Sequence, residues 1–405
     1  MRAAAARAPP PGTPLEVLLA FTRLGVSSFG GPIAHLGYFR REFVERRAWV
    51  SEPTYASLVA LCQFLPGPAS SQVGFCIGLA RAGYAGALAA WAGFTLPSAA
   101  AMVAFSYGAR ALSGEPGGAL LHGLRLVAVA VVAQAVCSMA RTLCPDRERG
   151  AIALLAMLTV LLGASSAAQI VAMAAGALAG VVLCRGAHPG AAEPLHLPPT
   201  PRAGLTALAV FLLLLLGLPV VRAATHAGAV TLAESFYRSG ALVFGGGHVV
   251  LPLLRASVVA PGWVSDADFL SGYGAAQAVP GPLFSFAAYL GAVVSVGPRG
   301  IPGAALALTA LYLPGLLLLV GALPFWDAIR RGSYAAGAVA GVGAAVVGLL
   351  AAALYDPIWT TTVTSRGDFA IAVLGFALLA LWRTPPLAVA LISAGCSVAL
   401  ARAGA

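Results

Sequence analysis

The sequence contains no lysine and few charged residues of any kind. All 24 basic residues of the 405-residue chain are arginines, and charged residues make up only 9% of it. An ordinary soluble protein has about 25% charged residues. The chain has six cysteines, but they form no CxxC motif and no metal-ligand spacing with histidine, so we expect neither disulfides nor a metal site. The scarcity of charge excludes a soluble globular enzyme.

Apolar residues dominate the chain instead. They make up 60% of it, and the mean hydropathy is +0.89. A helix needs about 20 mostly apolar residues to cross a bilayer, so the chain has room for roughly a dozen spans and no sizeable extramembrane domain. We therefore expect an all-α, polytopic integral membrane protein with about 12 to 13 transmembrane helices. We expect it to be a multi-pass protein.

The excess of arginine gives the chain a net charge of +10. In a soluble protein this charge would suggest nucleic acid as a partner. Here most arginines lie in short loops between apolar segments, which is the pattern that anchors loops on the cytoplasmic side of a membrane. We therefore expect the lipid bilayer as a partner and no nucleic acid. An anionic substrate is a secondary inference.

The apolar segments fall into two groups of six, with a single helix between them. Spans are predicted near 15–33, 55–80, 84–112, 119–141, 149–165, 167–185, 204–222, 230–248, 268–296, 302–324, 332–354, 368–383 and 385–402. The predicted organisation is a tail at 1–14, a first repeat at 15–185, a Pro-rich linker with a connecting helix at 186–229, and a second repeat at 230–402.

The two groups are related in sequence. FTRLGVSSFGGPIAHL at 21–36 aligns with FYRSGALVFGGGHVVL at 236–251, and QFLPGP at 63–68 aligns with QAVPGP at 277–282. Glycines and prolines matched at a nearly constant offset indicate an internal repeat. With six spans in each half and one helix between them, the second half would enter from the opposite face, and the repeats would be inverted. If 55–80 and 268–296 are re-entrant hairpins, the halves would be parallel. We favour inversion.

Each repeat interrupts its apolar segments at corresponding places, with FGGP or FGGG first and PGP second. Such breaks free backbone N–H and C=O groups, which are tolerated at membrane depth where they line a cavity, and paired breaks point to a transport site. A helix that begins after each PGP would offer N–H groups to an anion. The alternative is that these residues only kink helices for packing. The substrate-binding candidates are Gly30, Gly31, Pro32, Pro66, Gly67, Pro68, Ser70, Ser71, Gln72, Gly245, Gly246, Pro280, Gly281, Pro282 and Ser285.

Two arginines lie inside apolar segments, shortly before the glycine breaks. Arg23 and Arg238 are candidate substrate ligands, because a charge at this depth is costly and usually functional. Alternatively, each reaches the interface or pairs with a nearby acid, as Arg238 could with Glu234. Both interpretations remain open. His122 and Arg125 enter another span together without a counterpart in the second half, and we interpret them as interfacial.

Acidic residues are nearly absent from the predicted spans. This argues against a metal cation or sodium as substrate, and we expect no metal site and no cofactor. Candidates for proton coupling are Glu234, His35 and His248, although a lone histidine is more often only a hydrogen-bonding residue. The arginines between 40 and 47 are interpreted as a solvated helix face.

The region 27–98, with its FGGP and PGP elements and the Arg-rich helix and tryptophan between them, resembles the signature domain of the chromate ion transporter family. The second half resembles the partner domain in the long, two-domain form of that family. This resemblance implies export of chromate across the inner membrane, driven by the proton gradient, with sulfate as a related substrate. The second half departs from the first with Gly247 for Pro32, Ala278 for Phe64 and no equivalent of Ser70.

The leading hypothesis is therefore an oxyanion exporter that works by alternating access. The first alternative is a transporter of another anion, such as sulfate or molybdate. The second is an integral membrane enzyme, which is disfavoured because no span holds a catalytic constellation of carboxylates, histidines or a Ser/His/Asp set. Assembly into a homodimer is left open.

Overall fold

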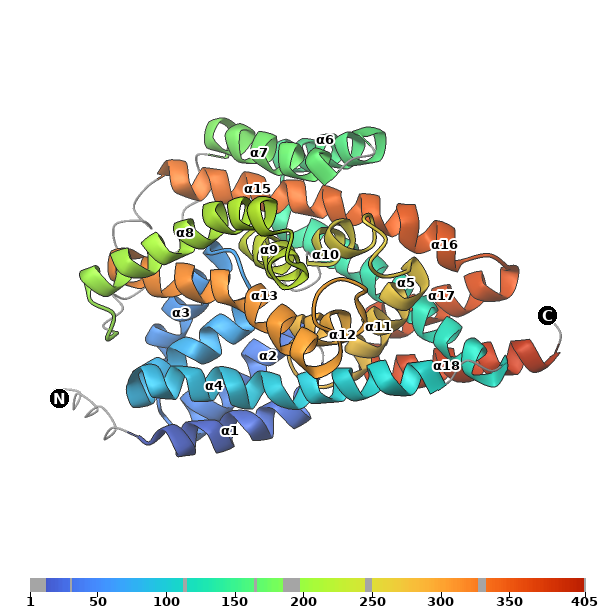
Figure 1. The fold of residues 1–405 in the computed structure, drawn as a ribbon, viewed down its shortest axis with the longest axis horizontal. Helices are drawn as coiled ribbons and strands as arrows, with labels where there is room; N and C mark the ends of the chain where they lie inside the picture. Colours follow the sequence, from blue (N-terminus) through green and yellow to red (C-terminus); the bar gives the residue numbers. More distant parts are fainter. Residues whose placement is uncertain are drawn as a thin grey trace.

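The computed structural model describes residues 12–29, 31–111, 115–163, 166–184, 197–244, 250–326 and 333–403, and every regular element in these ranges is a helix (Figure 1). Five helices among them are long and apolar enough to cross a membrane: Ala69–Gly108, Gly118–Leu143, Pro201–Thr225, Gly300–Phe325 and Ala336–Thr362. The all-α, polytopic membrane fold predicted from the sequence is confirmed.

The helices that lead into the Gly and Pro motifs are too short to cross a bilayer. They are α1 (Pro14–Ser27), α3 (Glu52–Phe64), α9 (Gly228–Ala241) and α11 (Asp266–Ala278), with 13 or 14 residues each. At 1.5 Å per residue, 14 residues extend about 21 Å, against a hydrocarbon core of about 30 Å. The predicted segments near 15–33, 55–80, 230–248 and 268–296 are therefore broken at or before their Gly and Pro motifs, as the sequence indicated.

The start of three of these short helices is fixed by side-chain caps. The Thr13, Ser51 and Ser265 side chains accept hydrogen bonds from the first-turn N–H groups of α1, α3 and α11. Such caps satisfy backbone donors that have no partner inside the helix. The two repeats thus use a serine at the same position to begin α3 and α11.

Each repeat also forms a helical hairpin that is closed by an ion pair. In the first repeat α2 (Gly31–Phe39) continues as the π-helix η1 (Arg40–Arg46), and the Arg40 Nε donates to Glu52 at 2.8 Å. In the second, α10 (Val250–Val258) carries Arg255, whose Nε donates to Asp266 at 2.9 Å. The pairs occupy equivalent positions, so the repeat extends from sequence to side-chain contacts.

The helix after each PGP motif turns back on itself. In the first repeat α4 (Ala69–Ala111) contains a turn at Ala82–Gly83. The second repeat forms η3 (Leu283–Ser285), α12 (Phe286–Val293), α13 (Gly300–Ala322) and η4 (Leu323–Phe325) in succession. The turns match, since Gly83 has φ +63° and Gly300 has φ +64°.

The turns at Gly83 and Gly300 lie at opposite ends of the part of α4 that follows Gly83. The Gly12 N–H donates to the Arg81 carbonyl at 2.9 Å, which places the start of the described chain at the first turn. At the far end, the Tyr107 hydroxyl lies 2.7 Å from the Cβ position of Gly300. Residues 83 to 107 of a helix extend about 36 Å, roughly the thickness of a bilayer. In Figure 1, α1–α3 accordingly lie toward the N-terminal side, and α10–α12 lie farther toward the C-terminal side.

The remaining helices interlock the two halves. They are α5 (Glu115–Leu143), α6 (Arg147–Gly163), α7 (Ser166–Leu183), α8 (Pro201–Thr225), α15 (Ser333–Ala353) with its extension through η5 (Leu354–Trp359) and α16 (Thr360–Thr362), α17 (Arg366–Ala380) and α18 (Pro386–Ala403). The α5 helix of the first repeat packs against α17 and α18 of the second, while α15 of the second packs against α6 and α7 of the first. The repeats therefore exchange one helix each.

The exchanged helix α15 packs on α7 through glycines. A Cβ at Gly341 would lie 2.7 Å from the Cα of Gly180 and even closer to the Gly176 carbonyl oxygen. Small residues that let backbones touch are a common basis of helix association in membranes, because apolar side chains gain little there by leaving lipid.

Gly341→Ala is expected to lower the thermal unfolding temperature of the purified protein, because the new methyl group meets backbone atoms that cannot move aside. Overpacking of this kind costs about 1–3 kcal/mol. Gly343→Ala is the matched control two residues away on the same helix, since its Cβ would meet only the flexible Leu143 side chain at 3.8 Å. Equal unfolding temperatures for the two variants would contradict the close packing of α7 and α15.

Candidate functional site

The two PGP turns are hydrogen-bonded crosswise to the opposite repeat. The Gly67 N–H donates to the Val243 carbonyl at 2.7 Å, and the Gly281 N–H donates to the Ser28 carbonyl at 2.9 Å. Ser28 and Val243 are equivalent positions, each just before the Phe-Gly-Gly sequence of its repeat. Each PGP turn thus satisfies backbone groups at the helix break of the other half.

Glycine is required at the centre of both turns. Gly67 has φ +127° and Gly281 has φ +101°, a region that residues with a side chain rarely adopt. A Cβ would also lie 3.1 Å from the Gly315 Cα in the first case and 2.9 Å from the Ser98 Oγ in the second. Ser98 and Gly315 each follow the Leu-Pro sequence of a long helix, so both turns press against equivalent points of the opposite repeat.

The first turn of α4, directly after the first PGP motif, is polar and buried. Ser70, Ser71 and Gln72 are at most 3% exposed. The His35 Nδ1, from α2, lies 3.4 Å from the Ser70 Oγ. Gln72 Nε2 donates to the Pro66 carbonyl at 3.0 Å and to the Gly315 carbonyl at 2.9 Å, and so holds the turn against α13.

Several buried polar atoms around this helix start have no hydrogen-bond partner among the described residues. They are Ser28 Oγ, His35 Nε2, Ser71 Oγ, Gln72 Oε1, Thr95 Oγ1 and Tyr312 OH. The Tyr312 hydroxyl is near the hydroxyls of Ser71 and Thr95, without a hydrogen bond of normal geometry. A buried group left unsatisfied costs about 1–3 kcal/mol, so such a concentration indicates a site built for a polar ligand. We call Ser28, His35, Ser70, Ser71, Thr95 and Tyr312 the central polar cluster.

The central polar cluster combines these side chains with a helix N-terminus. The first N–H groups of a helix have no partner within it, and the aligned peptide dipoles place about half a positive charge there. Carboxylates are absent from the cluster itself, so nothing in it repels an anion. The arrangement can bind an anion by hydrogen bonds without a neutralising cation.

The equivalent helix start in the second repeat carries fewer polar side chains among the described residues. Ser285 is buried at the corresponding helix start, but Phe284 and Phe286 stand where the first repeat has Ser70 and Gln72. Both rings are at most 1% exposed and pack against aromatic neighbours, Phe284 on Tyr312 and Phe286 on Tyr273. Among the described residues, the two helix starts therefore differ, with three polar side chains in the first repeat and one serine between two phenylalanines in the second.

Among the other candidates, Gly31 begins α2 with φ +77°, and Pro32 follows it in the first turn. The candidate prolines of the PGP motifs flank the two central glycines; they are Pro66, Pro68, Pro280 and Pro282. Gly30, Gly245, Gly246 and His248 lie outside the described residues.

The two arginines proposed as ligands lie toward the exterior. Arg23 is exposed, and the side chain of Arg238 is 44% exposed. The Arg238 Nε lies 3.4 Å from one carboxylate oxygen of Glu234, and Arg222 donates to the other oxygen at 2.7 Å. This contact of Arg222 was not predicted from the sequence. The alternative that we left open for Arg238, a pair with Glu234, is therefore present. Substrate binding by either arginine stays a prediction.

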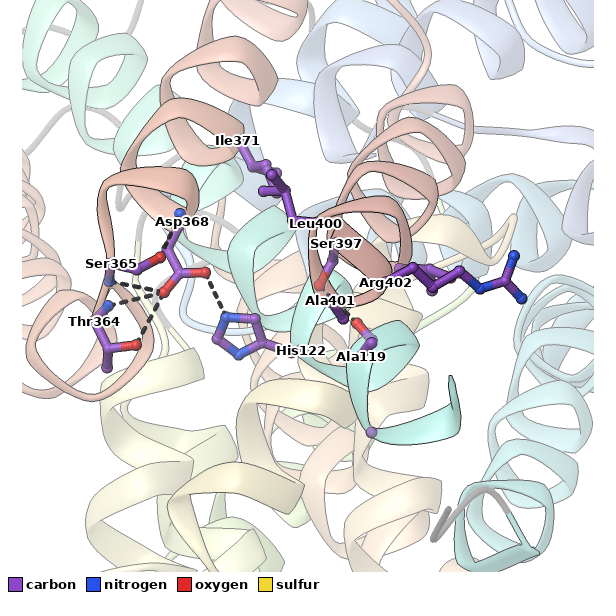
Figure 2. Close-up of a pocket in the computed structure, with 12 residues that line it drawn as sticks. Ala119, His122, Thr364, Ser365, Asp368, Ile371, Ser397, Leu400, Ala401 and Arg402 are labelled. Carbon is purple, nitrogen blue, oxygen red and sulfur yellow. Dashed lines mark hydrogen bonds and ion pairs between the residues drawn. The ribbon is translucent and has the colours of Figure 1, made fainter. Parts of the chain in front are cut away.

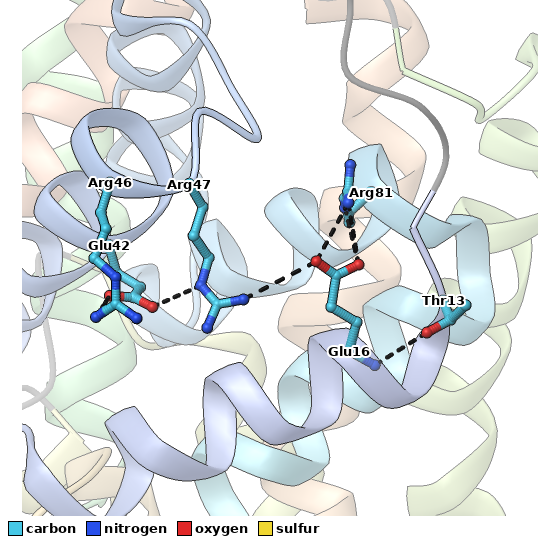
Figure 3. Close-up of polar contacts among 6 residues, drawn as sticks. All are labelled: Thr13, Glu16, Glu42, Arg46, Arg47 and Arg81. Carbon is cyan, nitrogen blue, oxygen red and sulfur yellow. Dashed lines mark hydrogen bonds and ion pairs between the residues drawn. The ribbon is translucent and has the colours of Figure 1, made fainter.

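A network of charged side chains ties α1 to the end of the first hairpin (Figure 3). The Glu16 carboxylate accepts hydrogen bonds from Arg81 at 3.1 and 3.2 Å and lies 4.0 Å from Arg47. Arg47 in turn donates to Glu42 at 2.6 Å. Glu42 is only 8% exposed, so the helix face that we expected to be solvated is partly buried.

The sequence did not lead us to predict Ser28, Thr95 and Tyr312 as site residues. A signal was present, because Thr95 and Tyr312 each precede the repeated Leu-Pro sequence and are therefore equivalent. Because one repeat has threonine and the other has tyrosine at this position, the alignment of the repeats gave no reason to select either residue. Among the described residues, no three His, Cys, Asp or Glu side chains gather in a way that could hold a metal ion.

Comparison with known proteins identifies relatives over most of the chain. The family described as chromate transporter matches residues 15–181 and 230–399. The chain is 29% identical over 354 residues to the chromate transport protein of Pseudomonas aeruginosa, covering 86% of this chain and 82% of that one. It is 29% identical over 343 residues to the probable chromate transport protein of Synechococcus elongatus, covering 82% of each. No solved structure matches the chain.

Gly67→Ala is expected to lower the thermal unfolding temperature, because the new side chain is strained at this φ and meets Gly315. Backbone strain of this kind costs about 1–3 kcal/mol. Gly37→Ala is the control, since its Cβ position is open and its backbone is helical. An unfolding temperature of Gly67→Ala equal to that of the control would show that the turn does not need glycine.

Proposed function

Because the chain belongs to the chromate transporter family, we propose that it exports chromate from the cell by alternating access, driven by the proton gradient. The observation that carries this proposal is the central polar cluster at the start of α4. A transport function, rather than an enzymatic one, is also what the family match supports.

The cluster suits a tetrahedral oxyanion in several ways. Chromate presents four oxygen atoms that only accept hydrogen bonds, and hydroxyls of Ser28, Ser71, Thr95 and Tyr312 can all act as donors. The buried, unsatisfied state of these groups means that a bound oxyanion would relieve a cost already present in the fold. Uncharged donors also allow release, since a dianion held by several arginines would leave slowly.

Sulfate has the same shape and charge, and molybdate is a close analogue. The hydroxyl donors would contact only the oxygen atoms of the anion and not its central atom, so we propose that sulfate competes with chromate. Competition in uptake assays with purified protein in liposomes distinguishes a chromate transporter from a transporter of another tetrahedral anion.

An inverted arrangement of the repeats is part of the proposal. Its support is the placement of the equivalent turns at Gly83 and Gly300 at opposite ends of one membrane-length helical segment. The connecting helix α8 also runs antiparallel to α13, because a Cβ at Gly204 would lie 3.3 Å from the Phe325 ring and a Cβ at Gly228, just after α8, would lie 2.6 Å from the Gly297 nitrogen, just before α13. The crosswise PGP contacts would then join two half-sites that alternate in access to the two faces.

The orientation follows from arginine in equivalent loops. Positive residues concentrate on the cytoplasmic side of membrane proteins. The first repeat carries Arg40, Arg41, Arg46, Arg47 and Arg81 at its hairpin end and turn, whereas the second carries Arg255 and Arg299. We therefore place the hairpin end of the first repeat in the cytoplasm and that of the second outside.

Ser71→Ala and Tyr312→Phe are each expected to raise the half-saturating chromate concentration roughly ten- to a hundredfold. The reason is that a hydrogen bond to a charged group contributes about 1.5–3 kcal/mol. Ser106→Ala, on the same helix as Ser71, is the matched control, because the Ser106 hydroxyl donates to its own helix at Val103. Uptake of labelled chromate into liposomes measures the effect. Unchanged half-saturation in both test variants would remove the cluster from the substrate path.

Opposite accessibility is expected for two exposed alanines at the hairpin ends, Ala48 and Ala260. Cysteines placed there singly, after replacement of the native cysteines, are treated with a membrane-impermeant maleimide. Ala260→Cys should react in intact cells, and Ala48→Cys should react only after permeabilisation. Labelling of both from the same side would contradict the inverted arrangement.

A further inference from the structure

A histidine and an aspartate from different repeats meet in an open cavity away from the central polar cluster. The His122 Nε2, on α5, lies 2.7 Å from the Asp368 Oδ1, at the start of α17 (Figure 2). It is the one ion pair between histidine and a carboxylate in the part of the chain that the structure describes. The cavity has a volume of about 880 Å³ and is lined by both side chains.

Asp368 is built to remain an anion. Its Oδ2 accepts hydrogen bonds from the Thr364 N–H at 3.0 Å, the Thr364 hydroxyl at 2.9 Å and the Ser365 N–H at 3.0 Å. It also stands in the first turn of α17, where the helix dipole favours negative charge. A carboxylate with these donors keeps its charge whether or not a proton arrives nearby, so the group that can change its protonation is His122.

The His122 ring can take up a proton without losing its contact with Asp368. In the neutral ring, Nε2–H donates to Asp368 and Nδ1 carries the free lone pair. The side chain is 29% exposed, against 10% for Asp368, so water in the cavity can deliver a proton to the ring. Binding forms one N–H bond at Nδ1 and gives an imidazolium paired with the carboxylate.

The turn of α5 that carries His122 also contacts the transport framework. Gly123 packs so closely on α18 that a Cβ there would lie 2.5 Å from the Ala394 Cα, and Leu124 packs its carbonyl group against Gly274 of α11. The Arg125 Nε donates to the Ser271 hydroxyl of α11 at 3.0 Å. Since α11 leads directly into the second PGP turn, a change in the α5–α17 contact reaches that turn through adjacent residues.

We propose that the His122–Asp368 pair is the proton-binding site of the transporter. The inference rests on the proposed function, since it assigns the coupling step of that transport to particular residues. The cavity lies at the end of α5 that faces α11 and the second-repeat hairpin, which is the outer side in the proposed orientation. A proton bound there from outside strengthens the α5–α17 contact, and its release to the cytoplasmic side in the other conformation resets that contact, so that one proton moves inward in each cycle.

The surrounding charges modify this pair but do not replace it. Arg125 on α5, Arg366 on α17 and Arg402 on α18 are always protonated, and Asp268 on α11 lies near Arg125. The three arginines oppose a further positive charge, whereas the Asp368 carboxylate, in contact with the His122 Nε2, attracts one. This is a role that the interfacial interpretation from the sequence did not foresee.

The test is the ratio of proton flux to chromate flux in liposomes that contain the full-length protein and a pH-sensitive dye. His122→Gln keeps a hydrogen-bond donor but cannot bind the proton, and the ratio is expected to fall at least tenfold. Asp368→Asn keeps an acceptor for the helix cap and is expected to lower the ratio similarly. A ratio is used because a partial loss of folded protein lowers both fluxes together.

Asp146→Asn is the matched control. Asp146 lies in the loop between α5 and α6, where hydrogen bonds from Arg149 hold the pKa of this carboxyl below its usual value. The Asp146→Asn variant should keep the wild-type ratio of proton flux to chromate flux.

A wild-type ratio in His122→Gln or Asp368→Asn would overturn the assignment while leaving the proposed function intact. No proton flux in the wild-type protein would instead refute proton coupling itself. Loss of chromate flux in both variants at normal abundance in the liposomes would place the pair in the substrate path and overturn its assignment to protons.

Discussion

The backbone of a helix that stops inside a membrane must find hydrogen-bond partners, and this constraint organises the protein. Four helices of 13 or 14 residues end at or before their Gly and Pro motifs, and their last peptide groups have no partner within the helix. The crosswise bonds from Gly67 to Val243 and from Gly281 to Ser28 satisfy part of this demand. Each repeat completes the broken helices of the other, so the centre forms only when both halves are in place.

The same requirement explains why the glycines and prolines of the two repeats agree so well while other side chains diverge. In both repeats, the turn geometry at Gly67 and Gly281 tolerates no residue larger than glycine. The first turns of the following helices face no such limit. One repeat carries Ser70, Ser71 and Gln72 there, and the other carries two phenylalanines around Ser285. A symmetric backbone thus supports a site that is polar on one side and packed by aromatic rings on the other.

Much of the framework was accessible from the sequence, because glycine and proline report backbone geometry directly. The membrane fold, the internal repeat and the helix breaks all follow from their positions and from the scarcity of charge. Helix lengths were less accessible, since hydropathy cannot tell a continuous span from two shorter helices joined at PGP. Long-range side-chain partners were not accessible at all. Nothing in the sequence indicates that Arg222 pairs with Glu234, that Tyr312 lies near Ser71, or that His122 meets Asp368.

The exchange of α5 and α15 sets a condition on how the chain becomes folded. During synthesis α6 and α7 emerge long before α15, whose Gly337 and Gly341 fit against Gly176 and Gly180. Likewise α5 emerges before α17 and α18, which carry the residues that pack around His122. The first half must therefore wait in the bilayer with two helix faces uncovered until the second half is inserted. A ribosome that stops between the halves would leave a chain whose glycine-lined surfaces are open to other membrane proteins, so the repeat is a unit of sequence but not a unit of folding.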